Sequence, residues 1–423
     1  MALAELITIG DELLIGQVVD TNSAWIAQQL NFIGVKVKQI TSVSDDEVHI
    51  VNALNEAASR ADMILVTGGL GPTRDDVTKY TLCKYFKSNL RFDEEVFMDI
   101  EKIFTDRGKK VNDVNRKQAQ VPEKCQVLRN SVGTAPGMWF EKDGKVVVSM
   151  PGVPHEMKAM MEKSVLPALK QRFQTPSIFH KTVLTQGIGE SFLADMIKDW
   201  EDALPPNLKL AYLPGLGTVK LRLSGTGENA ETLQNQVMEE IKKLLWIIDD
   251  FVFGFDDDTL EQIVGDLLSK KEATLSTAES CTGGYIAHRV TTVPGSSNYY
   301  MGSVVAYANL VKENFLDVPL ELMNQHGAVS EEVVKVMAEN AARKFKTTYA
   351  IASTGIAGPD GATPGKPVGT VWIAISTPEG CITRKLALGS TRLRIISETS
   401  LNALNMLRKI LVGKHAYHEA AAK

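Results

Sequence analysis

The sequence predicts an α/β protein with two α/β domains joined by a small α+β connector. Three observations support this prediction. Apolar, β-branched runs alternate with amphipathic helical segments, many of the runs stop at glycines, and an aspartate-rich segment at 249–258 separates two such blocks. A length of 423 residues suits roughly two to four domains. We therefore predict domains at 1–170, 176–250 and 259–411.

The first block reads as an open sheet with covering helices. Its expected elements are strands at 3–9, 35–43 and 63–66, a helix capped by Asp20 or Asn22, and a helix at 48–59. Ligands of such sheets bind beyond the carboxyl ends of the strands. The chemistry is therefore expected near 10–12 and 67–76.

The other two blocks carry their own elements. In the connector we expect strands at 181–186, 209–213 and 218–224 and helices at 190–200 and 230–245. In the last block we expect strands at 273–277, 304–307, 349–353 and 370–377 and helices at 331–345 and 391–411. Asp258 or Thr259 should cap the helix that opens this block.

Composition narrows the class of protein. Lys plus Arg number 46 and Asp plus Glu 51, so the net charge is 46 − 51 = −5, which disfavours non-specific nucleic-acid binding. Four well-separated cysteines indicate neither a zinc knuckle nor a disulfide framework and suit a reducing cytoplasm. No apolar run of about 18 residues indicates a membrane span. The polar tail at 415–423, native or not, is set aside.

A glycine-rich loop follows the strand at 63–66. The amides of Gly68, Gly69 and Gly71 can approach a phosphate closely, and Thr73 can add a hydroxyl. Candidate ligands for a divalent cation are Asp11, Asp75 and Asp76. The alternative, a tight turn with helix-capping carboxylates, is about equally supported by spacing alone. His155 and Glu156 are secondary candidates.

A second motif, residues 277–284, stands at a strand-to-helix turn. Ser280 there would lie near backbone amides that suit an oxyanion. A serine needs a base, and a desolvated Lys312 would be neutral enough to accept its proton. The alternatives are that Ser280 caps a helix, that Lys312 is solvated, or that Cys281 is the nucleophile.

Several motifs in register resemble the CinA family (competence/damage-inducible proteins). Over 1–170 the resemblance is to its molybdopterin-binding-like domain, through the segments at 10–14, 20–22, 67–76, 133–137 and 151–157. Over 259–411 it is to the nicotinamide-nucleotide amidase domain, through the segments at 278–284, 294–297, 307–312, 326–330, 354–359 and 366–371. The connector would be KH-like. Ala308, where relatives usually carry Ser, and the extra sequence 362–365 depart from the pattern.

The resemblance implies a bifunctional pyridine-nucleotide hydrolase. The first domain would be an ADP-ribose pyrophosphatase that uses Mg, Mn or Co. The last would convert nicotinamide mononucleotide to nicotinate mononucleotide and ammonia without a metal. Ser280 would attack, Lys312 would take the proton, and Ser297 and Tyr307 would orient these two residues or relay protons. Implied substrate contacts are Gly283, Gly284, Thr354, Gly355 and Arg394, the last with the phosphate.

Two other functions remain open. In the second hypothesis the first domain handles molybdopterin in cofactor biosynthesis, since the same fold does so. A non-catalytic partner in DNA uptake or repair is the third hypothesis. The connector has no basic GXXG loop, Gly215-Leu216-Gly217 being only a turn signal, so RNA binding is not expected. The resemblance further implies a homodimer, whereas the expected cytoplasmic location and lack of membrane contact come from the cysteines and the absence of a long apolar run.

Overall fold

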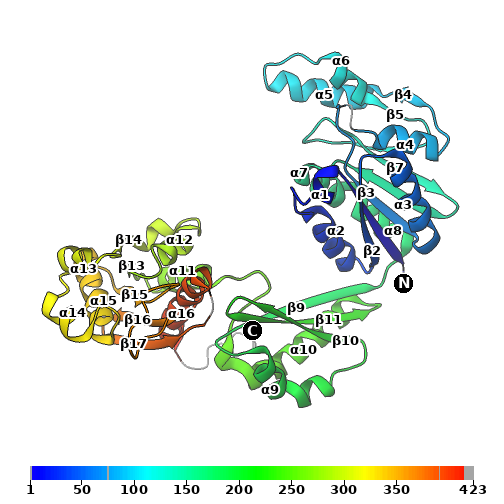
Figure 1. Ribbon diagram of the computed structural model, residues 1–423. Coiled ribbons are helices and arrows are strands. Elements are labelled where there is room, and N and C mark those ends of the chain that lie inside the picture. Colours follow the sequence, from blue (N-terminus) through cyan, green and yellow to red (C-terminus); the bar gives the residue numbers. More distant parts are fainter. Residues whose placement is uncertain (1, 74–75, 390, 414–423) are drawn as a thin grey trace. The chain divides into compact units, whose positions relative to one another are not determined.

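The computed structural model describes residues 2–73, 76–389 and 391–413. Asp75 and the tail at 415–423 lie outside this range. The described chain divides into two compact units, residues 1–179 with 225–234 and residues 180–224 with 235–423. Figure 1 gives the course of the chain. The α/β fold class is confirmed, and no helix of the described residues is long and apolar enough to cross a membrane.

The first unit contains a six-stranded sheet. Its order is β2 (Lys36–Val43), β1 (Leu3–Ile9), β3 (Met63–Thr67), β8 (Lys145–Met150), β7 (Gly137–Lys142) and β6 (Gln126–Leu128). The first four strands run parallel, and β7 and β6 are antiparallel additions. The carboxyl ends of β1, β2, β3 and β8 therefore share one edge.

Helices cover both faces of this sheet. One apolar core lies under α2 (Thr21–Phe32), α7 (Pro154–Met160) and α8 (Leu166–Phe173), and the other under α3 (Glu47–Arg60) and α4 (Thr78–Tyr85). A π-helical turn, Met161–Val165, joins α7 to α8. The remaining elements are α1 (Asp11–Leu14), β4 (Leu90–Phe92), α5 (Glu94–Asp106), α6 (Asp113–Arg116) and β5 (Gln120–Pro122). Asp20 is the cap of α2, since its side chain accepts from the Ser23 amide.

The connector is a four-stranded sheet with two helices. The strand order is β10 (Leu208–Gly215), β11 (Thr218–Gly227), β9 (Ser177–Gln186) and β12 (Val252–Phe255). The helices are α9 (Glu190–Asp202) and α10 (Ala230–Ile248), which meet through Trp200 and Glu240. Gly215 and Gly217 lie at the β10–β11 turn, as their spacing predicts.

The last sheet has five strands. Its order is β14 (Tyr300–Val305), β13 (Leu275–Glu279), β15 (Tyr349–Gly355), β16 (Thr370–Thr377) and β17 (Gly380–Ala387). Strands β14, β13 and β15 are parallel, and β16 and β17 are antiparallel. One face packs on α15 (Glu331–Phe345), and the other on α11 (Leu260–Lys270) and α16 (Arg392–Val412). Shorter helices are α12 (Tyr285–Thr291), α13 (Asn309–Leu316) and α14 (Leu320–His326).

Two strand predictions in this sheet are displaced. The strand expected at 304–307 is Tyr300–Val305, because β14 is an edge strand whose exposed face and Gly302 hide its start from an apolar pattern. The strand expected at 273–277 is Leu275–Glu279. It therefore delivers Glu279, rather than Thr277, to its carboxyl end.

Candidate functional site

Three parallel strands bring the residues of the last sheet's candidate site together. Glu279, the last residue of β13, is paired with Val305 of β14 and Ser353 of β15. The Ser280 amide donates to the Ser353 carbonyl (3.0 Å), and the Ala306 amide to the Glu279 carbonyl (2.7 Å). The chain segments that carry Ser280, Tyr307 and Thr354 thus begin at the same edge of the sheet.

Lys312 is enclosed at this edge. Its side chain projects from α13, and the residue is only 2% exposed. The Nζ donates to the carbonyls of Ala306 (2.8 Å) and Tyr307 (3.3 Å), and no acceptor among the described residues takes its third hydrogen. Burial lowers the pKa of Lys312 below its usual 10.5. The amine is therefore easier to deprotonate than a solvated lysine.

Cys281, the alternative nucleophile, has a pKa that is raised rather than lowered. The thiol is buried, and burial raises the pKa of Cys281 to about 12, although the charge of Lys312 and a hydrogen bond from Ser353 act against the rise. A thiol with that pKa stays protonated at neutral pH and is a poor nucleophile. Lys312 Nζ donates to the Ala306 carbonyl, and the Ala306 amide donates to the Glu279 carbonyl, so Lys312 lies beside the end of β13 that precedes Ser280.

The turn after β13 is held by a buried carboxylate. Glu279 is 0% exposed and accepts from the amides of Gly284 (3.1 Å), Ile286 (3.0 Å) and Ala287 (2.7 Å). The Gly283 amide donates to the Ser280 carbonyl (3.1 Å). The amides of Gly283 and Gly284, which were expected to contact substrate, are therefore already engaged within this turn.

Other expected substrate contacts have structural partners. Thr354 is 1% exposed, and its hydroxyl donates to the Ala328 carbonyl (2.8 Å). Gly355 ends β15 where an added Cβ would lie 2.7 Å from Val371 Cγ2. Both residues therefore have structural roles at the end of β15, and a side chain at Gly355 would disturb β16.

Arg392, which the sequence analysis missed, reaches the site in place of the expected arginine. Arg394 is half exposed, and its Nε donates to Glu398 (2.7 Å) one helical turn away. Arg392 donates to the Gly358 carbonyl (2.8 Å) and to the hydroxyl of Tyr307 (2.7 Å). Arg392 opens α16, and its position one residue after the Thr391 cap was the available signal.

Ser297 is not brought to Ser280. It is exposed in the short turn Ser296–Asn298, directly before β14 begins. Because β13 and β14 are parallel, this turn lies at the amino-terminal edge of the sheet, roughly 13 Å from the carboxyl end that precedes Ser280. Within one chain, the geometry does not support the expected orienting role of Ser297.

The first unit has a cavity of about 490 Å³ at the carboxyl ends of β1 and β3. Four carboxylates line it, from Glu12, Asp45, Asp76 and Glu156. No Lys, Arg or His of the described residues lines it. Lys79, whose charge reaches Asp76, lies outside the lining and donates to the Lys117 carbonyl (3.2 Å). The cavity is therefore strongly acidic.

Most polar groups of the glycine-rich loop are already paired. The Gly68 amide donates to the Met150 carbonyl (3.1 Å), and the Gly71 amide to Asp76 (2.8 Å). The amide and hydroxyl of Thr73 also donate to Asp76. Gly68, Gly69 and Gly71 were the expected phosphate contacts. Of their three amides, that of Gly69 is the one with no acceptor among the described residues. Asp76 thus closes the loop, which agrees with the turn interpretation of this carboxylate.

Asp45 belongs to this site and was missed from the sequence. It follows β2 and accepts from the Asp11 amide (3.1 Å), so the expected ligand Asp11 lies beside it. Burial raises the pKa of Asp45, and the nearby charges of Asp11, Glu12 and Asp76 raise it further. The rule that placed Asp11 at the end of β1 applies equally to the end of β2 and would have found Asp45.

The donor set fits a cation that binds together with phosphate. Among the described residues, no three His, Cys, Asp or Glu side chains converge as a preformed ion cage. Mg²⁺, however, is usually held by one or two carboxylates plus substrate phosphate oxygens. The mutual repulsion around Asp45 is what such a cation would relieve.

Of the two secondary candidates, His155 and Glu156, only Glu156 lines the cavity. His155 is exposed and does not line the cavity. Glu156 lines it and accepts from Asn130 Nδ2 (2.6 Å), which also donates to the Ala135 carbonyl. An added Cβ on Gly133 would lie 2.0 Å from the Glu156 carboxyl carbon. Glu156 therefore anchors the loop at 130–135.

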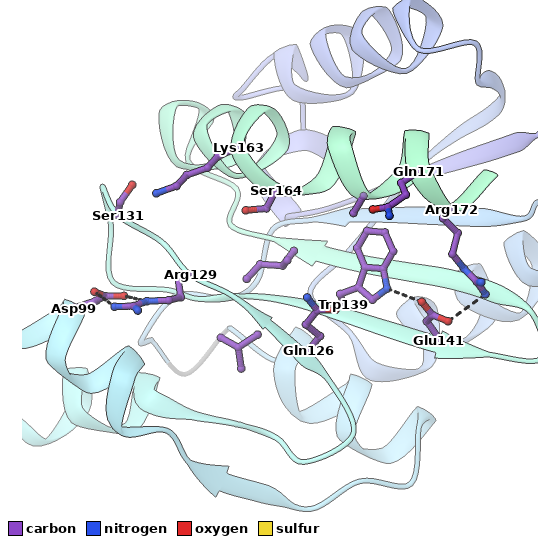
Figure 2. A pocket seen from close by; sticks show the side chains of 13 residues that line it. Asp99, Gln126, Arg129, Ser131, Trp139, Glu141, Lys163, Ser164, Gln171 and Arg172 are labelled. Carbon is purple, nitrogen blue, oxygen red and sulfur yellow. Dashed lines mark hydrogen bonds and ion pairs between the residues drawn. The ribbon is translucent and has the colours of Figure 1, made fainter. Parts of the chain in front are cut away.

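A larger cavity of about 680 Å³ lies between β6, β7 and α8, away from the glycine-rich loop (Figure 2). Its arginines are already neutralised, Arg129 by Asp99 (2.6 Å) and Arg172 by Glu141 (3.1 Å). Trp139 also donates to Glu141 (3.3 Å). These pairs hold the walls of the cavity, and Lys163 is the remaining cationic side chain among its described lining residues.

Comparisons with known proteins cover nearly the whole chain. Residues 5–171 match a family model described as "Probable molybdopterin binding domain", residues 180–254 "Damage-inducible protein CinA KH domain" and residues 257–411 "CinA C-terminal domain". A CinA-like protein of Cytophaga hutchinsonii is 50% identical over 408 residues, which is 96% of this chain and 98% of the relative. Another, from Flavobacterium psychrophilum, is 46% identical over 98% of this chain and 99% of its own length. Among solved structures, the protein CinA with unknown function from Thermoplasma acidophilum is 35% identical over 41% of this chain and 98% of that chain, with a TM-score of 0.37.

Proposed function

Because this chain belongs to the CinA family, we propose that it is a bifunctional hydrolase of pyridine nucleotides. The last sheet would carry an amidase that converts nicotinamide mononucleotide to nicotinate mononucleotide and ammonia. The first unit would carry a metal-dependent ADP-ribose pyrophosphatase. The observation that carries the proposal is the enclosed Lys312, whose pKa burial lowers at the sheet edge that bears Ser280.

In the amidase reaction, Ser280 is the nucleophile and Lys312 the base. A bond forms between Ser280 Oγ and the carboxamide carbon, and the hydroxyl proton passes to the neutral Nζ of Lys312. The carbon–nitrogen bond then breaks, and the proton leaves with ammonia. Water attacks the resulting ester by the same route, which releases the carboxylate product and restores Ser280. This half needs no metal.

Arg392 is the better candidate for the substrate phosphate. Its guanidinium already bridges the Gly358 carbonyl and the Tyr307 hydroxyl beside the site, whereas Arg394 is paired with Glu398. A guanidinium can give two parallel hydrogen bonds to a phosphate. Tyr307 would then orient two residues. Its hydroxyl accepts from Arg392, and its carbonyl accepts from Lys312 Nζ.

The amidase assignment is tested by ammonia release from nicotinamide mononucleotide. We expect the full chain to release one ammonia per nicotinate mononucleotide formed, with and without a chelator. Loss of this activity on adding the chelator would contradict a metal-free serine–lysine mechanism. An active full chain whose Ser280→Ala variant remains equally active would also exclude the assigned nucleophile.

The acidic cavity favours pyrophosphate chemistry only in the presence of a divalent cation. Asp45 with Asp11 or Glu12 would hold the ion, which when bound supplies a Lewis acid for a phosphoryl oxygen. Asp76 keeps the glycine-rich loop in shape, and the Gly69 amide remains for a phosphate oxygen. Without the ion, four lining carboxylates would repel a dinucleotide anion.

This second activity is tested with ADP-ribose and Mg²⁺, Mn²⁺ or Co²⁺. We expect Asp45→Asn to raise the metal concentration for half-maximal hydrolysis roughly tenfold or more. Glu101→Gln, a change of an exposed carboxylate on α5 away from the cavity, serves as the matched control. Binding of a pterin without any hydrolysis of ADP-ribose would support the molybdopterin alternative instead.

A further inference from the structure

Glu279 is a buried carboxylate that the amidase mechanism does not use. Burying a carboxylate costs several kcal/mol unless hydrogen bonds compensate. Here the compensation comes from three backbone amides at the start of α12, together with the Thr277 hydroxyl at 3.4 Å. Charge-assisted hydrogen bonds of this kind are roughly twice as strong as neutral ones. Glu279 thus fixes the serine turn, residues 280–287, to the end of β13.

Almost every amide of the serine turn has an acceptor. The amides of Gly284, Ile286 and Ala287 donate to Glu279. Those of Ser280, Gly283 and Tyr285 donate to the carbonyls of Ser353, Ser280 and Thr282. In the described part of the chain, the Thr282 amide has no acceptor, and the Cys281 amide faces only its own weakly accepting sulfur.

The two remaining amides belong to the residues directly after Ser280. An oxyanion formed by attack of Ser280 would develop close to its own turn, where fixed backbone donors stabilise it best. The same donors would lose their effect if the turn could move, because stabilisation of the oxyanion depends on donors that are oriented in advance. The position of the turn is set by Glu279.

We propose that Glu279 is the positioning residue of the amidase site, which holds the serine turn so that the Thr282 and Cys281 amides form the oxyanion site. This inference rests on the proposed attack by Ser280. A supporting layer lies behind Glu279. The Thr277 hydroxyl shares its one hydrogen between Ser303 (2.7 Å) and, at longer range, Glu279 (3.4 Å), and it accepts from the Tyr300 hydroxyl (2.7 Å). The layer keeps the carboxylate from turning away from the amides.

The test compares Glu279→Gln with Glu261→Gln. The new carboxamide replaces one acceptor oxygen with an NH₂ group that cannot accept from an amide. Glu261 is the matched control, since it is a nearly buried carboxylate that binds α12 through Arg289 (2.8 Å) at the other end of the helix. We expect Glu279→Gln to lower kcat for ammonia release about 100-fold with KM within about twofold, because loss of one oxyanion donor costs about 10²–10³ in kcat. Glu261→Gln should lower the melting temperature without lowering kcat more than about twofold.

A second readout does not depend on the substrate. A fluorophosphonate should label Ser280 of the wild-type chain, with an oxygen–phosphorus bond formed, fluoride expelled and the hydroxyl proton passed to Lys312. We expect labelling, followed by intact mass, to slow in Glu279→Gln in parallel with kcat and to persist at the wild-type rate in Glu261→Gln. If Glu279→Gln fails to fold, Thr277→Val, which loosens the same carboxylate, should slow both reactions about three- to tenfold.

The outcomes separate this inference from the proposed function. Normal labelling without ammonia release would reject the amide substrate, and the labelling comparison would still decide the role of Glu279. Equal losses of kcat in Glu279→Gln and Glu261→Gln would overturn the inference, as would an unchanged kcat in Glu279→Gln. A wild-type chain that neither releases ammonia nor labels at Ser280 would remove the nucleophile and this inference with it.

Discussion

The two candidate sites share a plan and differ in charge. Each lies at the carboxyl ends of parallel strands, and in each a carboxylate accepts backbone amides of a glycine-containing turn, Asp76 in the first and Glu279 in the second. In the first site, the described lining residues add further carboxylates and no cationic side chain, whereas the second site encloses Lys312. The same strand geometry therefore supports two chemistries, one that needs an external cation and one with its own base.

The largest expected effect concerns the nucleophile of the second site. Ser280→Ala should reduce ammonia release by about 10⁴-fold, since removing a nucleophile disables the whole catalytic unit. Cys281→Ala should retain most activity, because its buried thiol has a pKa of about 12 and stays protonated. Single-turnover rates of both variants check this. A dominant loss in Cys281→Ala would move the chemistry to sulfur.

The next effect concerns the internal base. Lys312→Met should lower kcat by about 10²–10⁴-fold, the usual contribution of general-base catalysis. Burial lowers the pKa of Lys312, so the neutral form gains as pH rises, and the wild-type rate should climb tenfold per pH unit along a limb that ends below pH 10.5. A pH–rate profile measures this limb, which should vanish in the variant. A melting curve verifies that the variant is folded.

The two arginines of α16 should differ in substrate affinity. Arg392→Leu should raise KM for nicotinamide mononucleotide about 10- to 100-fold, as expected for losing hydrogen bonds to a charged phosphate. Arg394→Leu should change KM less than about twofold, because the Arg394 guanidinium is paired with Glu398 one helical turn away. Steady-state kinetics decide between them, and the reverse ranking would restore Arg394 as the phosphate contact.

The smallest effect compares a glycine from each site. At Gly68, with φ +112°, an added Cβ would lie 2.1 Å from the Ile9 carbonyl oxygen, so Gly68→Ala should cost about 2–3 kcal/mol. At Gly283, with φ +61°, the added Cβ meets open space, and Gly283→Ala should cost only about 1 kcal/mol. Urea unfolding measures both. Equal losses of unfolding free energy in the two variants would mean that the Ile9 backbone shifts to make room for the added Cβ.

Sequence patterns were most reliable where one physical signal dominated. Leu3–Ile9, Glu331–Phe345 and Thr370–Thr377 have the predicted bounds because each has a clear apolar period and a clear end. The start of β14 was missed because an edge strand with Gly302 has no such period. Local patterns therefore identify elements that are buried on at least one regular face.

The predictions for the site residues also succeeded or failed for physical reasons. Ser280, Tyr307 and Thr354 were grouped only through the resemblance to the amidase domain, and the parallel pairing of β14, β13 and β15 brings their chain segments to one edge of the sheet. Ser297 was misplaced because it precedes its strand rather than following it. The engagement of the Gly284 amide by Glu279 could not be predicted, since it depends on which way a buried carboxylate faces. Side-chain direction is a tertiary property that spacing does not encode.

The enclosure of Lys312 also limits which residues evolution could substitute there. An arginine has comparable reach, but its guanidinium never gives up its proton in a protein. It would therefore place a permanent positive charge in a buried space, since Lys312 is only 2% exposed. A histidine is too short to meet the carbonyls of Ala306 and Tyr307 from the same helix. Among the standard amino acids, only an amine on a four-carbon stem can fill this position and still exchange a proton.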